Sequence, residues 1–431
     1  MERLPVFSGE EIFRRLSESR SLPAGKKRVK LPAGRYFLEW PIILTAADNG
    51  LIFEGSGPEK TQLIGASLIT GWHRQGKNFL AAYLAEVASG KWFFRHLYVN
   101  GSAAARSRLP ETGYFEHESV FDVRWMSTSG GGWERKPTAE ELGSLVYRKG
   151  DPGRWFDPAS AEITLVHLWD ESLVGVRRHD DSRRRIFFSN PAGHPAGAFG
   201  VRKYAIWNIR EGLRRPGQWY LNRKSGQLVY WPRQHEKADA IEVLAPLLDT
   251  IVSFQGEEKQ PVEEIVFQNL SLTATGSPLK AGGFGAREYP GAIELDNVRR
   301  CHFSELHIHS VGGQAIRGQA DETTVENCRF WLTGAGGVVL SGRDNEIRKN
   351  EIFRIGQAYR SAIGLWLSGY RHKVVGNRLA DTPYTAIACS QDGHLVAGNV
   401  IKRAVTGLTD GAAIYVTFAQ RVSVRGNYVS Q

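Results

Sequence analysis

Three aspartates near the carboxyl end, Asp381, Asp392 and Asp410, have the type and spacing to do chemistry. Paired carboxylates can act as general acid, general base or nucleophile. In glycoside hydrolysis the two groups lie roughly 5 Å apart in retaining sites and about 6.5 to 9.5 Å apart in inverting sites. The elements that carry these aspartates therefore decide which of them can act together.

The chain from residue 266 onward repeats one short phrase, a branched apolar residue followed by asparagine after one or two variable positions. The phrase ends at Asn269, Asn327, Asn350, Asn377, Asn399 and Asn427. From the second asparagine onward the intervals are 23, 27, 22 and 28 residues, a drifting period typical of repeat architectures. Short apolar runs broken by Gly, Asn, Asp or Ser favour strands over helices. We predict an all-β parallel β-helix, one coil per repeat, with the asparagines stacked in a ladder.

The rest of the chain predicts an insertion and an amino-terminal cap. From Glu111 to Ala245 the strands are longer, tryptophans are frequent and the phrase is missing, which predicts an inserted β-sandwich or barrel. Near the start, Ser8 and Glu11 form a capping-box pattern before an apolar helix face, and such a helix would cover the first coil. The expected domains are residues 1–110, 111–245 and 246–431.

Composition narrows the classes of partner. The 431 residues are 42% hydrophobic with a formal charge of +10 from scattered arginines, without the basic stripe that nucleic-acid binding needs. A basic surface could still steer an acidic polysaccharide toward a groove. Cys301, Cys328 and Cys389 are too few for a disulfide framework and are expected as core thiols. We expect no metal, no membrane association and no signal peptide in this chain, because zinc spacings and long apolar runs are missing.

Several separated phrases carry a family resemblance. They are Leu97-Tyr-Val-Asn-Gly101 with Arg106 and Arg108-Leu-Pro110, Pro216-Gly-Gln-Trp-Tyr-Leu-Asn222, Gly226-Gln-Leu-Val-Tyr-Trp-Pro232 and Asp410-Gly-Ala-Ala-Ile-Tyr415. In this order they resemble right-handed parallel β-helix proteins related to glycoside hydrolase family 141. The resemblance implies a right-handed solenoid that cuts plant-type polysaccharides or oligosaccharides with acidic residues, in a family whose members are often secreted. It also implies a second acidic residue beyond Gln431, so we expect a chain truncated at its carboxyl end.

Strand stacking separates the three aspartates. If 386–389 and 413–416 lie in one column, Asp392 follows its strand and Asp410 precedes its own, so the two flank opposite ends. At about 3.3 Å per residue they are too far apart to form an acid/base pair. Asp381, on the preceding coil, is the best partner for Asp410 within the chain. The alternative partner is a carboxylate on the coil that would follow Gln431.

Other residues near this column could hold a sugar. His394 could orient a hydroxyl group or satisfy a coil turn, and Asp392 lies beside it. Trp366, Tyr384 and Tyr415 could stack on sugar rings, or they could belong to the core of the solenoid.

The hypothesis is a glycosidase in which Asp410, with Asp381, supplies the catalytic carboxylates on a polysaccharide or oligosaccharide and needs no cofactor. The first rival is a polysaccharide lyase, which needs a Lys or Arg base, such as Lys373 or Arg371, and usually Ca²⁺. The second rival is a non-catalytic glycan-binding or structural β-helix. The sequence does not determine the sugar, the linkage, the oligomeric state or the localisation.

Overall fold

The computed structural model describes residues 4–23, 25–127, 131–152, 157–238 and 240–431. The chain divides into two compact units. The first comprises Met1–Ser67, Leu244–Ser277 and Gly285–Gln431, and the second comprises Leu68–Val243 and Pro278–Phe284. No helix within the described ranges is long and apolar enough to cross a membrane.

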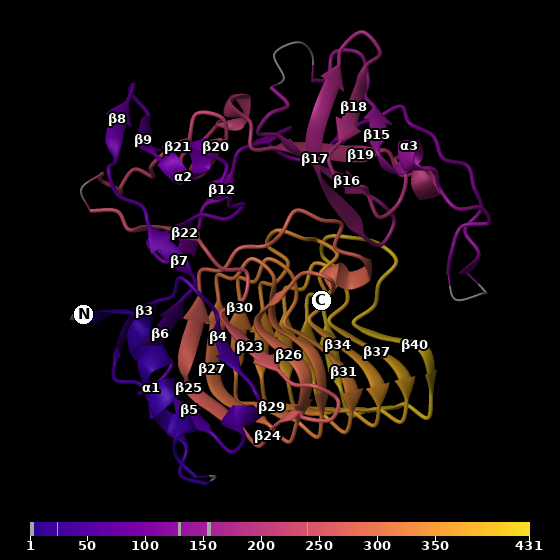
Figure 1. Cartoon of the computed structure of the whole chain (residues 1–431). Helices are drawn as coiled ribbons and strands as arrows, with labels where there is room; N and C mark the ends of the chain where they lie inside the picture. Colours follow the sequence, from indigo (N-terminus) through magenta and orange to yellow (C-terminus); the bar gives the residue numbers. More distant parts are fainter. Residues whose placement is uncertain (1–3, 24, 128–130, 153–156, 239) are drawn as a thin grey trace. The chain divides into compact units, whose positions relative to one another are not determined.

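The first unit is a parallel β-helix, which confirms the predicted fold (Figure 1). Within the described residues, one sheet has seventeen strands and the other nine, and the pairings along their columns are parallel. The first sheet contains β1 (Val6–Ser8), β2 (Arg28–Lys30), β3 (Gly34–Phe37), β5 (Ile52–Glu54), β6 (Thr61–Ile64), β25 (Val266–Thr273), β27 (His302–His309), β29 (Thr324–Glu326), β30 (Arg329–Trp331), β32 (Glu346–Arg348), β33 (Glu351–Phe353), β35 (Lys373–Val375), β36 (Arg378–Ala380), β38 (Leu395–Ala397), β39 (Val400–Lys402), β41 (Ser423–Arg425) and β42 (Tyr428–Ser430). The second contains β4 (Ile42–Leu44), β23 (Val252–Gln255), β24 (Val262–Glu263), β26 (Gly291–Arg299), β28 (Gln314–Asp321), β31 (Val338–Arg343), β34 (Leu365–Tyr370), β37 (Ile387–Asp392) and β40 (Ile414–Gln420).

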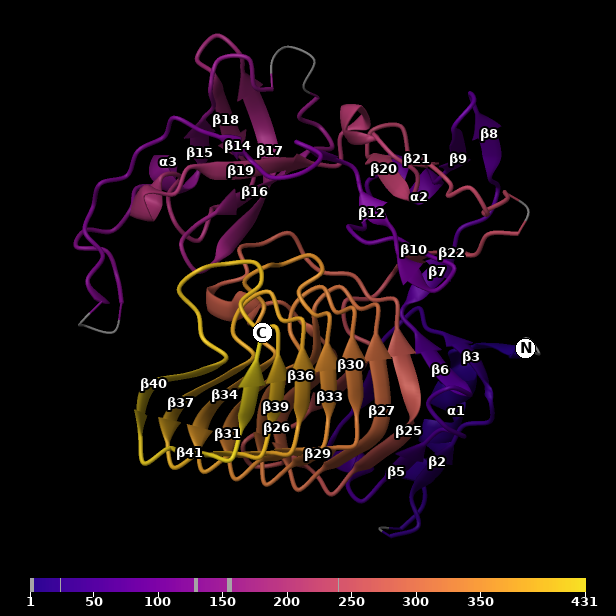
Figure 2. The same ribbon diagram turned by 180° about the vertical axis from the view of Figure 1, so that it is seen from behind.

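Each coil contributes inward-facing residues to one continuous core. In β32, β35 and β38 the middle residue is buried and its neighbours are more exposed, so Ile347, Val374 and Val396 stack in one column. The strands one bend further along stack Ile352 on Leu379 in the same way. Burying each such side chain stabilises the fold by about 1.5 to 3 kcal/mol relative to leaving it exposed. Figure 2 shows these columns from behind.

The predicted asparagine ladder is present at the bend between these two columns. The backbone N–H of Asn350 donates to the side-chain oxygen of Asn377 at 3.0 Å. The same contact joins Asn377 to Asn399 and Asn399 to Asn427, at 2.9 Å each. A left-handed residue precedes each of these asparagines, glycine before the last three. The ladder therefore satisfies buried backbone donors that no strand pairing reaches.

Two asparagines of the sequence pattern lie outside this ladder. Asn327 is exposed in the left-handed conformation, and Cys328 occupies the ladder position, donating its N–H to Asn350 at 2.9 Å. Asn269 also has a positive φ of 58°. Including Asn327 in the repeat was wrong by one residue, because asparagine is favoured both in the ladder and in left-handed turns.

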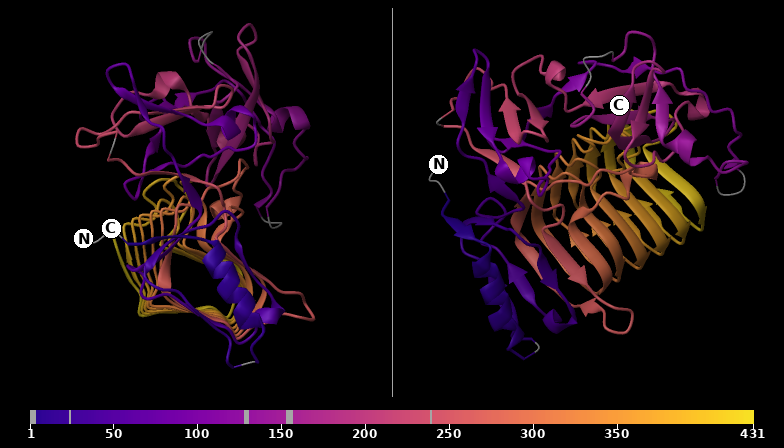
Figure 3. Two further views of the ribbon diagram at one scale, coloured as in Figure 1. Left: turned by 60° about the vertical axis from the view of Figure 1, so that its left-hand side comes forward. Right: turned by 45° about the horizontal axis from the view of Figure 1, so that its top comes forward.

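The amino-terminal helix α1 (Glu10–Arg20) lies across the first coils, as predicted (Figure 3). Its own residues Ile12 and Leu16 are buried. The predicted capping box is wrong, because Ser8 belongs to β1 and the helix begins after Gly9 with no side-chain cap. Glu11 instead accepts hydrogen bonds from the guanidinium groups of Arg14 and Arg15.

The second unit is the inserted β-rich domain. Its antiparallel sheet contains β13 (Arg108–Leu109), β14 (Phe115–Glu116), β15 (Ser144–Val146), β16 (Glu162–Val166), β17 (Glu171–Asp180), β18 (Arg185–Phe188) and β19 (Lys203–Trp207). A further sheet contains β8 (His73–Gln75), β9 (Phe79–Tyr83), β12 (Ala105–Arg106), β20 (Gln218–Asn222) and β21 (Gln227–Tyr230). The unit also contains α2 (Ala85–Ala88), α3 (Ala139–Leu142), β10 (Tyr98–Val99) and β11 (Ser102–Ala103). The strands β7 (Ala66–Leu68) and β22 (Val243–Pro246) contain the residues at which the chain passes from one unit to the other. The unit begins before the sequence-based boundary at residue 111, because β9 and β12 pair with β21 and β20.

Candidate functional site

Asp410 lies on the loop that joins β39 to β40, at the point where the chain returns to the second sheet. It is exposed and has a positive φ of 62°. The phenol of Tyr384 donates a hydrogen bond to its carbonyl oxygen at 2.7 Å. A Cβ at Gly411 would lie 2.7 Å from the Tyr384 ring, so only glycine fits at that position. The loop thus fixes the backbone of Asp410 and leaves the residue open to solvent.

Asp392 lies at the opposite end of the same strand column, as predicted. It pairs with Gln420, the last residue of β40, whereas Asp410 precedes the first. The guanidinium of Arg421 donates to the Asp392 carboxylate, with Nε 3.0 Å from Oδ2, and this contact lowers the pKa of Asp392. Arg421 thus engages the carboxylate of Asp392, and the role of Asp392 in binding sugar stays a prediction.

Asp381 follows β36 directly, in the left-handed conformation with φ 54°. The guanidinium of Arg403, one coil further on, donates to its carboxylate, with Nη2 2.8 Å from Oδ2. This hydrogen bond is the main reason that the pKa of Asp381 is lowered, and the charges of Arg403 and Arg354 act in the same direction. Asp381 is therefore ionised at neutral pH, which suits a nucleophile or general base.

The loops of three successive coils line a shallow, open pocket of about 630 Å³ beside Asp381. Its lining residues are Arg354, Ile355, Gly356, Gln357, Arg360, Asp381, Pro383, Thr406 and Gly407. Backbone hydrogen bonds fix the walls, with the N–H of Gly407 donating to Pro383 O at 2.7 Å and that of Gly356 to Ala335 O at 2.8 Å. The volume is within the range of small-molecule sites, and two arginines and one aspartate make the lining polar and cationic.

His394 is buried in a turn of the solenoid. Its Nδ1 accepts the backbone N–H of His372 at 3.2 Å, and its Nε2 lies 2.8 Å from Ser390 O. The two imidazole rings stack with centroids 5.2 Å apart, and burial lowers the pKa of both histidines. The prediction that His394 orients a sugar hydroxyl is contradicted, because both ring nitrogens are engaged and the side chain is covered. The contacts of His394 fit the alternative role, in which it satisfies backbone groups of a coil turn.

The three aromatic candidates differ in exposure. Trp366 and Tyr384 are buried, so neither offers a ring face to a sugar, and both belong to the packed interior. The guanidinium of Arg287 also lies over the Trp366 ring, 5.2 Å from its centroid. Tyr415 is half-buried on β40 and is the one member of this set that keeps partial exposure.

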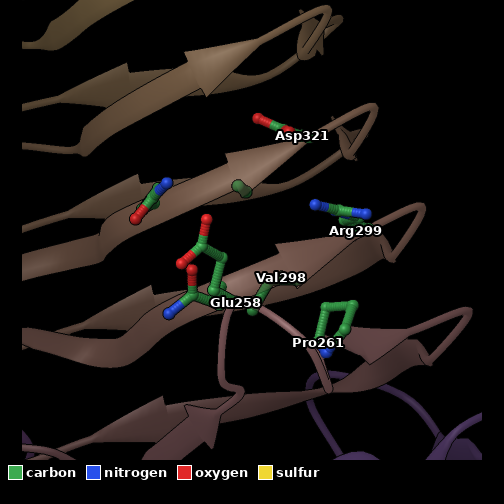
Figure 4. Close-up of a pocket in the computed structure, with 8 residues that line it drawn as sticks. Glu258, Pro261, Val298, Arg299 and Asp321 are labelled. Carbon is green, nitrogen blue, oxygen red and sulfur yellow. The ribbon is translucent and has the colours of Figure 1, made fainter.

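A second cavity lies over β26 and β28 (Figure 4). Glu258 extends from the loop after β23 above the strand of Val298 and Arg299, with Asp321 on the next strand. The cavity has a volume of about 20 Å³, room for about one water molecule and no sugar ring. Asp321 also accepts a hydrogen bond from the Nε of Arg343 at 3.0 Å, so its carboxylate is engaged.

A lyase would need a metal site and a free basic side chain near the aspartates. In the part of the chain that the structure describes, no three His, Cys, Asp or Glu side chains come together to hold a metal ion. Arg371, a predicted candidate base, donates through Nε to Asp344 at 2.8 Å, and this contact raises the pKa of the guanidinium. Lys373 is exposed on β35.

Sequence reasoning missed the arginines around Asp381. Arg354, Asp381 and Arg403 occupy one left-handed column, each four residues after a ladder asparagine. Counting forward from Asn350, Asn377 and Asn399 would have placed the three side chains together. The fixed offset of four residues from each ladder asparagine was therefore visible in the sequence, but the sequence-based prediction considered only the asparagines.

The fold defines the class of protein. The family model described as "Right handed beta helix region" matches residues 289–431, and the chain is a right-handed parallel β-helix with an inserted β-rich domain. No curated protein sequence matches the chain.

Solved structures were found that align with this chain. One described as "Glycoside hydrolase" is 18% identical, with a TM-score of 0.78 over 93% of this chain and 80% of its own. XylC in complex with xylose is 12% identical, with a TM-score of 0.47 over 96% of this chain and 63% of its own. A GH87 α-1,3-glucanase from Streptomyces thermodiastaticus strain HF3-3 is 12% identical, with a TM-score of 0.26 over 85% of this chain and 64% of its own. The first of these likenesses shows the fold, and the other two are too weak to add to it.

Proposed function

We propose that this protein is a glycoside hydrolase that cleaves a plant-type polysaccharide or oligosaccharide, related to family 141 as its sequence phrases suggest. The observation that carries the proposal is an exposed Asp410 on a solenoid loop whose neighbouring loops form a polar cavity with Asp381 in its wall. The likeness to a glycoside hydrolase of the same fold supports it.

The proposal gives the two aspartates different tasks. Asp381 is held in its ionised form by Arg403, so it serves as nucleophile or general base. Asp410 then delivers a proton to the departing glycosidic oxygen. No side chain within the described residues pairs with its carboxylate, which leaves it open for substrate. The alternative partner for Asp410 is a carboxylate on a coil beyond Gln431.

Of the two rival functions, glycan binding without catalysis has a specific observation in its favour. The cavity beside Asp381 is lined by backbone held in place by the solenoid, and Arg354 and Arg360 supply hydrogen-bond donors for a saccharide. Such a module would retain the cavity and lose only the cleavage step.

A product assay separates these functions. The protein is incubated with neutral and with uronate-containing oligosaccharides, each with and without a chelator. New reducing ends without absorbance near 235 nm, roughly where unsaturated uronates absorb, are the result that we expect. Chelator-sensitive absorbance would identify a lyase, and binding without new ends would identify a module; either result refutes hydrolysis.

A further inference from the structure

Three basic side chains lie together on the outer face of the first sheet, close to Asp381. In β33, β36 and β39, which lie side by side, the middle residue is buried, so the first and third residues face outward (Figure 2). Arg378 begins β36, Lys402 ends β39, and Arg354 follows β33 at the bend; all three are exposed. The strand register places Ala380, a small residue, in the middle of this cationic surface.

The three cations have no acidic partner. Elsewhere on the solenoid, arginines pair with a carboxylate on the neighbouring coil, as Arg371 does with Asp344. The side chains of Arg354, Arg378 and Lys402 form no ion pair or hydrogen bond in the part of the chain that the structure describes. The pattern by which the coils neutralise their charges is therefore interrupted at this surface.

Two carboxylates border the surface, and each has an arginine partner of its own. Glu351, beside Arg378 in register, lies 3.4 Å from the Nε of Arg329. Asp381 accepts from the Nη2 of Arg403 at 2.8 Å. Three positive charges remain on successive coils, within two coil spacings or about 10 Å. An anion from outside the chain would relieve their mutual repulsion, and the exposed surface gives it access.

A stack of aromatic rings ends at the same place. The rings of His309, Trp331 and Phe353 lie on successive coils, with centroids 4.4 and 6.0 Å apart and interplanar angles of 16° and 1°. Arg329 lies over Phe353, 4.9 Å from its centroid, and belongs to the coil before it. On the coil after Phe353 the same column holds Ala380, so the stack has no fourth ring there. A sugar ring over Ala380 would continue the stack, because its apolar face can pack on an aromatic ring.

The surface adjoins the open pocket beside Asp381. Arg354 and Asp381 both line that pocket, and Gln357 and Thr406 add polar side chains to it. Ala380 directly precedes Asp381. A saccharide with one sugar over Ala380 would therefore extend past the Asp381 carboxylate.

We propose that Arg354, Arg378 and Lys402, with the ring of Phe353, bind an acidic sugar over Ala380, and that the substrate of this protein is an acidic polysaccharide. The identification of the bound saccharide as substrate rests on the proposed hydrolase function, whereas its binding does not. A guanidinium fork matches a sugar carboxylate, with which it can form two parallel hydrogen bonds. A nucleic acid is also anionic, but a span of about 10 Å is short of the basic groove that follows a nucleic-acid strand.

Isothermal titration calorimetry with the whole chain tests this surface, using trigalacturonate, the neutral maltotriose and the thymidylate trinucleotide. The Asp410→Asn protein is measured beside the wild type, so that cleavage does not disturb the titration. We expect both proteins to bind trigalacturonate at least tenfold more tightly than maltotriose, with an affinity that falls as the ionic strength rises. Equal affinities for trigalacturonate and maltotriose would overturn the proposal. Thymidylate binding as tight as that of trigalacturonate would overturn the saccharide as ligand.

The product assay then separates binding from function. Trigalacturonate that binds and is cleaved to new reducing ends supports both parts of the proposal. Tight binding of trigalacturonate by a protein that releases reducing ends only from neutral saccharides would keep the binding surface and refute an acidic substrate.

Variants locate the binding. Arg354→Gln, Arg378→Gln and Lys402→Gln each remove one exposed cation and should weaken trigalacturonate binding about tenfold, because each loses a hydrogen bond between charged groups. Lys30→Gln is the matched control, since Lys30 is exposed and ends β2 of the same sheet, as Lys402 ends β39. The control should bind as the wild type does. Unchanged affinity in folded Arg354→Gln and Lys402→Gln proteins would overturn the assignment.

A change at Phe353 tests the stacking. Phe353→Leu removes the ring and keeps an apolar side chain, so the coil should stay packed. We expect it to weaken trigalacturonate binding at least about twofold. Unchanged affinity would refute the position of the sugar over Ala380.

Discussion

Replacing Asn377 by alanine tests the ladder that holds the coils in register. The Asn377 side chain is buried and makes four hydrogen bonds. It accepts from the N–H and the side-chain amide of Asn350, each at 3.0 Å, and donates to Ile347 O at 2.8 Å and to the Asn399 side-chain oxygen at 3.0 Å.

The magnitude follows from the groups left without a partner. The Asn350 side-chain amide keeps Val325 O as acceptor, and the Asn399 oxygen keeps the backbone N–H of Asn377. The backbone N–H of Asn350 and the carbonyl of Ile347 lose the partner that Asn377 gave them. At about 1 to 3 kcal/mol for each unsatisfied buried group, Asn377→Ala should lower the free energy of unfolding by roughly 2 to 6 kcal/mol.

Urea unfolding followed by tryptophan fluorescence and circular dichroism measures this loss. Asn327→Ala is the matched control, because Asn327 is exposed and lies one residue outside the ladder. We expect Asn327→Ala to lower the free energy of unfolding by about 1 kcal/mol or less, because alanine adopts the left-handed conformation less readily than asparagine. Equal losses in Asn377→Ala and Asn327→Ala would refute the ladder as a stabilising element.

Two further changes probe the turns of the solenoid. Burial lowers the pKa of His372 from 6.5 to about 4, so its contribution to stability is present above pH 6.5 and is lost as the pH falls toward 4, by roughly 3 kcal/mol. His372→Asn, which copies Asn345 of the preceding coil, should flatten the free energy of unfolding between pH 6.5 and 4; an unchanged pH slope would contradict this. A Cβ at Gly356 would lie 2.3 Å from Pro383, whereas one at Gly398 meets nothing within 4 Å, although both glycines have a positive φ. Gly356→Ala should therefore cost at least about 1 kcal/mol more than Gly398→Ala in urea unfolding, and equal costs would show that the cavity wall yields.

The solenoid could be predicted from sequence because its repeat places equivalent residues at fixed offsets from one another. A phrase that ends in asparagine fixes one position per coil, and fixed offsets then follow. His394 lies five residues before Asn399, as His372 lies five before Asn377, so both belong to one buried turn column. That offset was present in the sequence, but a lone histidine near an aspartate also fits a sugar site, and only the neighbour one coil away decides between them.

The site itself could be predicted only in part. Asp381 and Arg403 lie at one offset from the ladder, so their ion pair follows from counting. Asp410 lies on the loop of residues 403–413, which is longer than the loop of residues 381–386 on the preceding coil, and offsets from the ladder no longer place residues where the loop length changes. Its hydrogen bond with Tyr384 is a tertiary contact that no periodicity contains. By contrast, the sequence did exclude Asp392 as the partner of Asp410. The strand register alone places the two residues at opposite ends of one column.

The most direct test of the account is the kcat/KM of Asp410→Asn on the oligosaccharide that the product assay identifies. Loss of a catalytic carboxylate should lower kcat/KM by about 10² to 10⁴-fold, and Asp381→Asn should do the same. Asp344→Asn is the control, because Asp344 has the same left-handed conformation, pairs with an arginine one coil away, and is 36% exposed against 39% for Asp381. We predict that the control keeps wild-type kcat/KM. Activity of a folded Asp410→Asn protein that matches the control would contradict the proposed role of Asp410.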